Sequence, residues 1–186
     1  MTACPVVVAV VGALVGAVLL LGCVSQVVDD PPPPTEVPAD AEVASVDRVV
    51  DGDTVRVRLP PENAGADATS IRVRLLNIDA PERARDGRPE ECLAEAATAR
   101  VQRLLRDGDP VWLAADREDA DEFGRLLRGL WAADGTFVNE LLVAEGLAEP
   151  VLFPPNDRFH AAIVAAADRA ESAGRGIHGP SCPSDG

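Results

Sequence analysis

Alternating apolar and polar residues mark short strands in the middle of the chain. From Thr54 to Leu59, valine and leucine alternate with threonine and arginine, which is typical of a strand with one buried face. Asp51-Gly52 precedes this run, and the dipeptide predicts a two-residue hairpin turn. Runs rich in apolar residues predict further strands at Val46–Val50, Ile71–Ile78, Val111–Ala115 and Arg125–Trp131.

Three other segments have the features of helices. Glu90–Leu105 is rich in alanine with helical periodicity, and the turn-forming sequence after it predicts its end. Phe137–Glu145 and Asp157–Ala173 are each followed by a glycine, which is a common helix stop. Five short strands with about three helices predict an α+β domain, built as a small five-stranded OB-type barrel with the helices packed outside.

The N-terminal part of the chain differs from this pattern. Residues 5–22 form an unbroken run of apolar and small residues that ends before Cys23. The run indicates a lipoprotein signal with lipid attached to Cys23, and the alternatives are an ordinary signal or an uncleaved anchor. Four consecutive prolines in residues 24–42 favour an extended linker.

These boundaries divide the chain into four segments. Residues 1–23 are the signal or lipoprotein segment, 24–42 the proline-rich linker, 43–182 the folded domain and 183–186 a short tail. We therefore expect an exported protein that is either secreted or held at the cell surface as a lipoprotein. The membrane would be contacted only through the N-terminal anchor.

The charge of the chain is strongly acidic. Among 186 residues there are 31 acidic and 17 basic side chains, which gives a formal net charge of -14, and every basic one is arginine. An acidic surface repels polyanions at long range. Taken alone, this balance argues against a nucleic-acid partner.

Carboxylates at the ends of two predicted strands are the strongest candidates for chemistry. Asp53 has the parity of the buried face that follows it, and a buried carboxylate is costly unless it is paired or binds a metal. In Asp79-Ala80-Pro81-Glu82, the proline fixes a corner that presents two carboxylates and the Ala80 carbonyl. Oxygen ligands of this kind suit calcium.

Several separated blocks of sequence match one known family in order and spacing. The chain resembles staphylococcal nuclease and its thermonuclease relatives from about Val46 to Ile177. The matching blocks are Val50–Thr54, Arg74–Glu82, Glu95-Ala96, Asp121–Arg125, Ala133–Gly135, Val138–Glu140, Gly146–Ala148 and Pro155-Asn156.

The resemblance implies an exported calcium-dependent nuclease that hydrolyses phosphodiester bonds of DNA and RNA. Asp53, Asp79 and the main-chain oxygen of Ala80 would hold one Ca²⁺ ion. We expect the protein to act as a monomer. The alternative is a non-catalytic OB-type surface module that binds nucleic acid or protein, because this fold often serves as a binding platform.

The resemblance also implies three catalytic residues. Glu82 would act as general base on the attacking water, and Arg74 and Arg125 would bind the scissile phosphate. Such a centre is positive although the protein is acidic, and repulsion from distant charges is screened beyond roughly 8 Å at physiological salt. The acidic surface is therefore expected to slow the encounter with substrate without preventing it.

The chain departs from the family around the nucleotide. The family has tyrosines there, whereas this chain has Phe123, Val151 and Phe153, and Glu122 stands where a lysine is usual. Contacts with bases and phosphates outside the centre are therefore expected to be weaker.

Two cysteines lie in the folded domain. Cys4 and Cys23 belong to the N-terminal segment, which leaves Cys92 and Cys182. An even pair in an exported domain predicts a disulfide, and two free thiols are the alternative.

Overall fold

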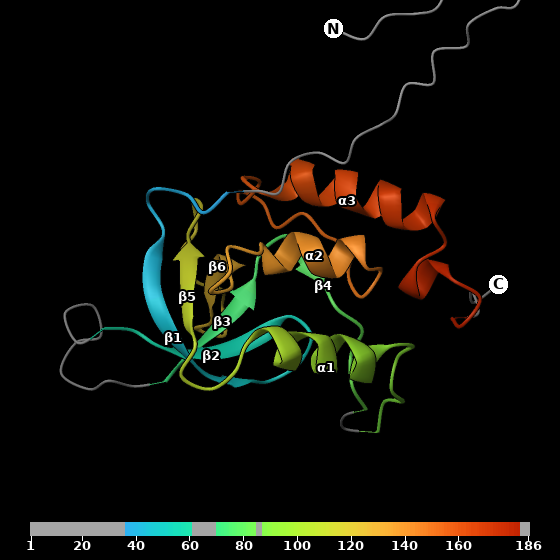
Figure 1. Cartoon of the computed structure of the whole chain (residues 1–186), viewed down its shortest axis with the longest axis horizontal. Helices are drawn as coiled ribbons and strands as arrows, with labels where there is room; N and C mark the ends of the chain where they lie inside the picture. Colours follow the sequence, from blue (N-terminus) through green and yellow to red (C-terminus); the bar gives the residue numbers. More distant parts are fainter. Residues whose placement is uncertain (1–35, 61–69, 85–86, 183–186) are drawn as a thin grey trace, which may run out of the picture. The chain divides into compact units, whose positions relative to one another are not determined.

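Five strands of the domain close into a barrel, and three helices pack beside it (Figure 1). The computed structural model describes residues 36–60, 70–84 and 87–182 of the chain. Around the barrel the strands are β1 (Glu42–Val49), β2 (Thr54–Arg58), β3 (Ile71–Leu75), β6 (Leu126–Trp131) and β5 (Pro110–Ala114). Strands β3 and β6 are parallel, and the other neighbours are antiparallel. The predicted α+β fold with an OB-type barrel is confirmed.

The helices are α1 (Ala94–Leu104), α2 (Val138–Ala144) and α3 (His160–Ser172), and α2 lies between the other two (Figure 1). Two short strands, β4 (Ile78–Asp79) and β7 (Glu149–Pro150), pair outside the barrel, and a 3₁₀ turn spans Gly176–His178. Helix α1 starts four residues later than the sequence predicts. Leu93, directly before it, has a left-handed backbone (φ 68°), so the chain cannot be helical there.

The barrel interior follows the predicted alternation. Val55, Val57 and Val73 are completely buried, and each such side chain contributes about 1.5–3 kcal/mol through burial. Beside the barrel, Trp131 stacks on Phe137 with 4.4 Å between ring centroids. The aromatic and aliphatic side chains form one continuous core beneath the helices.

The connection between β1 and β2 differs from the predicted two-residue hairpin, which is therefore wrong. The last paired residues are Val49 and Val55, so the connection is longer. The backbone amides of Val50 (3.0 Å) and Asp51 (3.2 Å) donate to the Thr54 oxygen, so the loop itself spans three residues, Asp51–Asp53. The Asp51 carboxylate accepts hydrogen bonds from the backbone amides of Asp53 (3.2 Å) and Thr54 (2.8 Å), which hold this loop.

Gly52 lets this loop pack against the rest of the domain. A Cβ atom at Gly52 would lie 2.7 Å from the Cβ of Ala80 and 3.0 Å from that of Ala97, closer than side chains can approach. The glycine therefore brings the neighbouring Asp53 close to the Asp79-Ala80 corner.

The predicted strand Ile71–Ile78 is divided into β3 and β4. Asn77 adopts a left-handed conformation (φ 62°), and its side-chain amide donates to the main-chain oxygen of Asn156 (3.0 Å). Since a strand cannot continue through such a residue, the chain turns here. The turn directs Asp79 and Ala80 toward Asp53, whose Oδ2 accepts a hydrogen bond from the Ala80 amide (3.0 Å).

The N-terminal predictions fall mainly outside the described residues. The apolar run, Cys23 and most of the proline-rich linker lie in residues 1–35. Within the described part, Val37 and Ala41 pack against the core, and Asp40 forms an ion pair with Arg158 (2.8 Å). None of the helices in the described residues is long and apolar enough to cross a membrane.

Candidate active site

Arg74 lies at the centre of the candidate site, near the end of β3. Its side chain is only 7% exposed. Nη1 donates to the main-chain oxygens of Leu75 (2.9 Å) and Ile78 (2.7 Å), which fixes the orientation of the guanidinium. Nη2 lies 3.1 Å from Oδ2 of Asp53 and 2.7 Å from Oδ1 of Asp79. One nitrogen therefore bridges the two carboxylates that the sequence predicts as ligands.

Asp53 is buried beside this arginine. Its Oδ1 accepts a hydrogen bond from the Thr54 hydroxyl (3.1 Å), and its Oδ2 accepts one from the Ala80 amide. Burial raises the pKa of the Asp53 carboxyl to about 6, although the positive charge of Arg74 opposes this shift. The charged carboxylate is thus incompletely compensated by the protein. Asp79, by contrast, is 63% exposed and faces solvent.

The oxygen atoms at this corner fit a hard cation. Asp53 and Asp79 meet at one arginine nitrogen, and Ala80 follows directly in the chain. Carboxylate and carbonyl oxygens are the ligands that calcium prefers, and water commonly completes its shell of six to eight. In residues 36–60, 70–84 and 87–182, no group of three or more His, Cys, Asp or Glu side chains gathers as a metal cluster. The Ala80 carbonyl and water would therefore have to supply the remaining ligands.

Arg125 lies directly before β6, close to the same edge of the barrel. The next residue, Leu126, pairs with Val73 on β3. Nε of Arg125 is 2.6 Å from Oδ2 of Asp121, and burial of Asp121 is outweighed by hydrogen bonds from Arg125, which lower the pKa of this carboxyl. In the described structure these contacts use Nε and the backbone amide of Arg125, so Nη1 and Nη2 remain available to a ligand.

Glu82 is exposed and lies just beyond the corner. Its backbone amide donates to Oε2 of Glu91 (2.8 Å), and the backbone amide of Glu91 donates to the main-chain oxygen of Glu82 (2.9 Å). Within the described residues no hydrogen bond joins the Glu82 carboxylate to the other candidates. It lines a pocket of about 280 Å³ together with Val50, Asp51, Arg83, Ala84 and Glu90.

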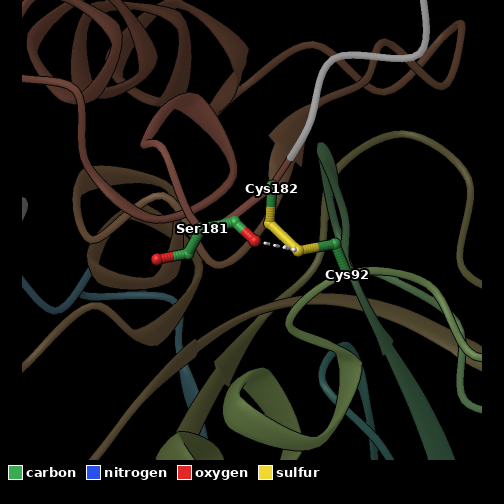
Figure 2. Close-up of a disulfide and its surroundings, with 3 residues drawn as sticks. All are labelled: Cys92, Ser181 and Cys182. Atoms are coloured by element: carbon green, nitrogen blue, oxygen red, sulfur yellow. Dashed lines mark hydrogen bonds between the residues drawn. A yellow bond between two sulfur atoms is a disulfide. The ribbon is translucent and has the colours of Figure 1, made fainter.

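The predicted disulfide between Cys92 and Cys182 is present next to this segment (Figure 2). Its Cα atoms are 5.7 Å apart, and the Ser181 oxygen lies 3.5 Å from Sγ of Cys92. Cys92 directly follows Glu91, the residue that holds the Glu82 backbone. Both cysteines line a cavity of about 250 Å³ with Asp79, Ala80, Pro81, Glu91, Glu149 and Ile177. The disulfide is therefore part of the wall beside the carboxylate corner.

Comparison with known proteins identifies the family. Residues 72–178 match the family model described as staphylococcal nuclease homologue. The thermonuclease of Staphylococcus intermedius is 32% identical over 162 residues, which cover 86% of this chain and 91% of that protein. The chain belongs to the staphylococcal nuclease family.

Other relatives in this family are also nucleases by name. The thermonuclease of Staphylococcus hyicus is 29% identical over 139 residues, covering 75% of this chain and 77% of that protein. Endonuclease YhcR of Bacillus subtilis is 31% identical over 150 residues, which are 74% of this chain and 12% of that much longer protein.

In this member of the family, a phenylalanine lies beside each candidate arginine. The guanidinium carbon of Arg74 is 5.4 Å from the ring centroid of Phe153, and that of Arg125 is 5.6 Å from Phe123. Phe123 is 63% exposed. Phe123 and Phe153 stand at positions where the family has tyrosines, and their rings lie next to the two arginines.

The structure thus joins Arg74 to both Asp53 and Asp79, and Asp53 to the Ala80 amide. Within the described residues, no hydrogen bond or ion pair joins Glu82 or Arg125 to this cluster. Sequence reasoning missed Glu91. Its position before Cys92 gave no signal, since its contact with Glu82 depends on how the segment between them folds back.

Proposed function

We propose that this chain is a calcium-dependent nuclease that hydrolyses phosphodiester bonds of DNA and RNA. The observation that carries the proposal is the buried Arg74, whose guanidinium is fixed between Asp53 and Asp79 at the edge of the barrel. Membership of the staphylococcal nuclease family and the endonuclease relatives support nuclease activity.

The candidate cation site would supply positive charge for binding the phosphate. Asp53, Asp79 and the Ala80 carbonyl would hold calcium, and a bound calcium ion supplies positive charge to the phosphate oxygens. A cation also compensates the Asp53 carboxylate, for which burial is costly. The oxygen-only donor set supports calcium over softer metals.

The two arginines act on the same phosphate. Hydrolysis increases negative charge on the non-bridging oxygens, and a guanidinium can bind two of them at once. Arg74 is oriented by main-chain oxygens through Nη1, and it would bind phosphate through Nε and, when a cation takes up Asp53 and Asp79, through Nη2. Arg125 keeps both terminal nitrogens available. Donors fixed before the reaction stabilise a transition state most, because they need not reorganise.

Glu82 is the proposed general base. Its carboxylate is exposed beyond the corner, where water can reach it, and its backbone is held by Glu91. A carboxylate in this place can accept the proton of the attacking water.

Export is proposed from different features. The apolar run of residues 5–22 is typical of a signal or anchor, and the Cys92–Cys182 disulfide is typical of an oxidising compartment. We propose a monomeric exported protein, either secreted or held at the membrane through its N-terminus, with lipid on Cys23 as the first alternative to test.

Removal of calcium is expected to abolish cleavage. Plasmid DNA and RNA are incubated with the purified protein in calcium, after exhaustive chelation, and after calcium is restored. Cleavage should disappear on chelation and return with calcium, while magnesium should replace it poorly because it requires a tighter octahedral shell. Undiminished cleavage after chelation would contradict the calcium site. Binding without cleavage in calcium would instead favour the non-catalytic binding module.

Glu82→Gln is expected to lower kcat about a hundredfold, since an amide cannot accept the proton of water. KM should change little because the substitution preserves shape. Glu171→Gln, at the exposed end of α3, removes the same charge far along the chain and should leave kcat unchanged. Steady-state kinetics on a labelled oligonucleotide makes the comparison, and parental kcat in Glu82→Gln would exclude the general-base role.

A further inference from the structure

Three arginines lie side by side across neighbouring barrel strands. Arg48 on β1 is paired with Arg56 on β2, and Arg56 is paired with Arg72 on β3. On the same strands Val55 and Val73 are completely buried, and side chains alternate, so the arginines lie on the outer face. Strands β1, β2 and β3 are consecutive in the barrel (Figure 1). We call Arg48, Arg56 and Arg72 the arginine row.

The arginine row leads to the candidate active site. Arg72 and Arg74 lie on the same side of β3, two residues or about 7 Å apart. Nη2 of Arg72 donates to the Phe123 main-chain oxygen (3.1 Å), so Arg72 also contacts the loop that carries Arg125. From Arg72 the row crosses two strand spacings, about 10 Å, to Arg48. It therefore continues the face of β3 that carries Arg74, and through Arg72 it contacts the loop that precedes Arg125.

The charges of the row are only partly balanced by the protein. Asp47 lies 3.9 Å from Arg56 and 4.0 Å from Arg48, but it also binds Arg58 through a short contact. In the described part of the chain, Arg72 forms no ion pair. Like charges directly opposite each other destabilise a sheet, and the Asp47 carboxylate, shared with Arg58, offsets only part of this repulsion.

Unused hydrogen-bond donors remain along the row. Arg56 uses Nε and Nη2 on Ser70, and Arg72 uses only Nη2, counting contacts among the described residues. Arg48 is 65% exposed. Guanidinium groups that are partly oriented and still have free donors are well suited to phosphate oxygens.

We propose that the arginine row binds the backbone phosphates of a nucleic-acid strand beyond the bond that is cut. This inference rests on the proposed function, because it extends the substrate site along the outer face of β3, β2 and β1. In a protein with a net charge of -14, such a local row gives the strand a defined path over the barrel. Each arginine that contacts a phosphate contributes to the salt dependence of binding.

The test measures binding separately from cleavage. The full chain carrying Glu82→Gln is titrated in calcium with a fluorescent single-stranded oligonucleotide of 16 nucleotides at several salt concentrations. Adding Arg48→Gln and Arg72→Gln should weaken binding about tenfold at low salt. The slope of log K against log[salt] should become shallower by about 1.4, since each phosphate contact on a single strand contributes about 0.7. Circular dichroism confirms that the variants are folded.

The matched control removes two charges elsewhere. Arg103 on α1 and Arg169 on α3 are replaced by glutamine, which changes the net charge equally but leaves the barrel strands intact. This control should retain most of the affinity and the parental slope. An equal loss in the control, or an unchanged slope in the row variant, would overturn the proposal. The same proteins are also titrated with poly-glutamate. If the row variant keeps oligonucleotide binding but loses poly-glutamate binding, the row binds an acidic protein partner and the proposal is overturned.

Failure of the row and failure of the proposed nuclease function give different results. If the unsubstituted protein cleaves in calcium but the row variant keeps the salt slope of the Glu82→Gln protein, only the row is wrong. If the unsubstituted protein never cleaves but Arg48→Gln and Arg72→Gln still weaken oligonucleotide binding, the row stands and the nuclease function is wrong.

Discussion

Arg74→Ala and Arg125→Ala are each expected to lower turnover about a hundredfold to a thousandfold. Both side chains are proposed to bind charge that grows on the phosphate in the transition state, and losing one such donor costs about 3–4 kcal/mol. Lysine should rescue neither position well, because an ammonium cannot make the two-pronged contact with phosphate. Steady-state kinetics on a labelled oligonucleotide measures kcat for the alanine and lysine variants.

The two arginines should differ in their effect on stability. Arg74 is buried and compensates the buried Asp53, so Arg74→Ala leaves that carboxylate without its partner in calcium-free protein. Arg125 is 27% exposed and its partner Asp121 is 17% exposed, so this pair is less buried than Arg74 and Asp53, and its loss should cost less, about 1 kcal/mol. Thermal unfolding with and without calcium separates this cost from the loss of activity.

The variant Arg125→Ala therefore gives the clearest test. If Arg125 were only a surface charge, its removal would leave kcat intact in a folded protein. Parental turnover in folded Arg125→Ala would mean that the family resemblance misassigns this residue. Arg74→Lys serves the same purpose at the buried position, because it keeps the positive charge beside Asp53 while changing its geometry.

The barrel and the carboxylate corner could be predicted because local pattern determines them. Alternation along Thr54–Leu59 gives the buried face, and the same parity predicts that Asp53 is buried. Pro81 restricts the backbone on both sides of its peptide bond, so a corner at Asp79-Ala80 follows from three adjacent residues.

Other features depend on partners far along the chain. The break after β3 requires Asn77 to be left-handed, and its amide is held by Asn156, 79 residues later. Helix α1 starts late because Leu93 has a left-handed backbone. This conformation is unfavourable for leucine, so the residue type does not predict it. Glu91 contacts Glu82 only because the segment between them folds back. Sequence pattern carries no signal for contacts of this kind.

The arginine row could not be predicted because it depends on strand register. Each of its residues fits the polar position of an alternating strand, so each is explained singly as a solvent-facing residue. Only the strand register, which pairs Arg48 with Arg56 and Arg56 with Arg72, places them side by side. Register between strands depends on loops and on packing, which the sequence alone did not determine.

Loss of the Cys92–Cys182 disulfide is expected to lower both stability and turnover. The bond closes a loop with a sequence separation of 90 residues, and the chain-entropy model gives an upper value of about 4–5 kcal/mol for so long a loop. The double variant Cys92→Ser/Cys182→Ser should therefore unfold at clearly lower temperature or denaturant concentration than the oxidised parent. Reductant should shift the parent toward the variant and leave the variant itself unchanged.

Turnover should fall because the disulfide holds the segment that orients Glu82. Cys92 is covalently fixed to the C-terminal region, and the adjacent Glu91 makes reciprocal hydrogen bonds with the Glu82 backbone. Releasing Cys92 lets this segment move, so kcat should decrease about tenfold with a smaller change in KM, an estimate based on the cost of misplaced catalytic groups. Reoxidation of the reduced parent should restore kcat.

Glu91→Ala separates the two effects of the disulfide. This variant keeps the covalent bond but removes the acceptor for the Glu82 amide, so it should retain most of the stability and still lose turnover. If Glu91→Ala keeps parental kcat while the cysteine variant loses activity only in proportion to its unfolded fraction, the disulfide serves stability alone. A fall in kcat for both folded variants supports an effect of the disulfide on the active site through Glu91, which directly precedes Cys92 and holds the Glu82 backbone.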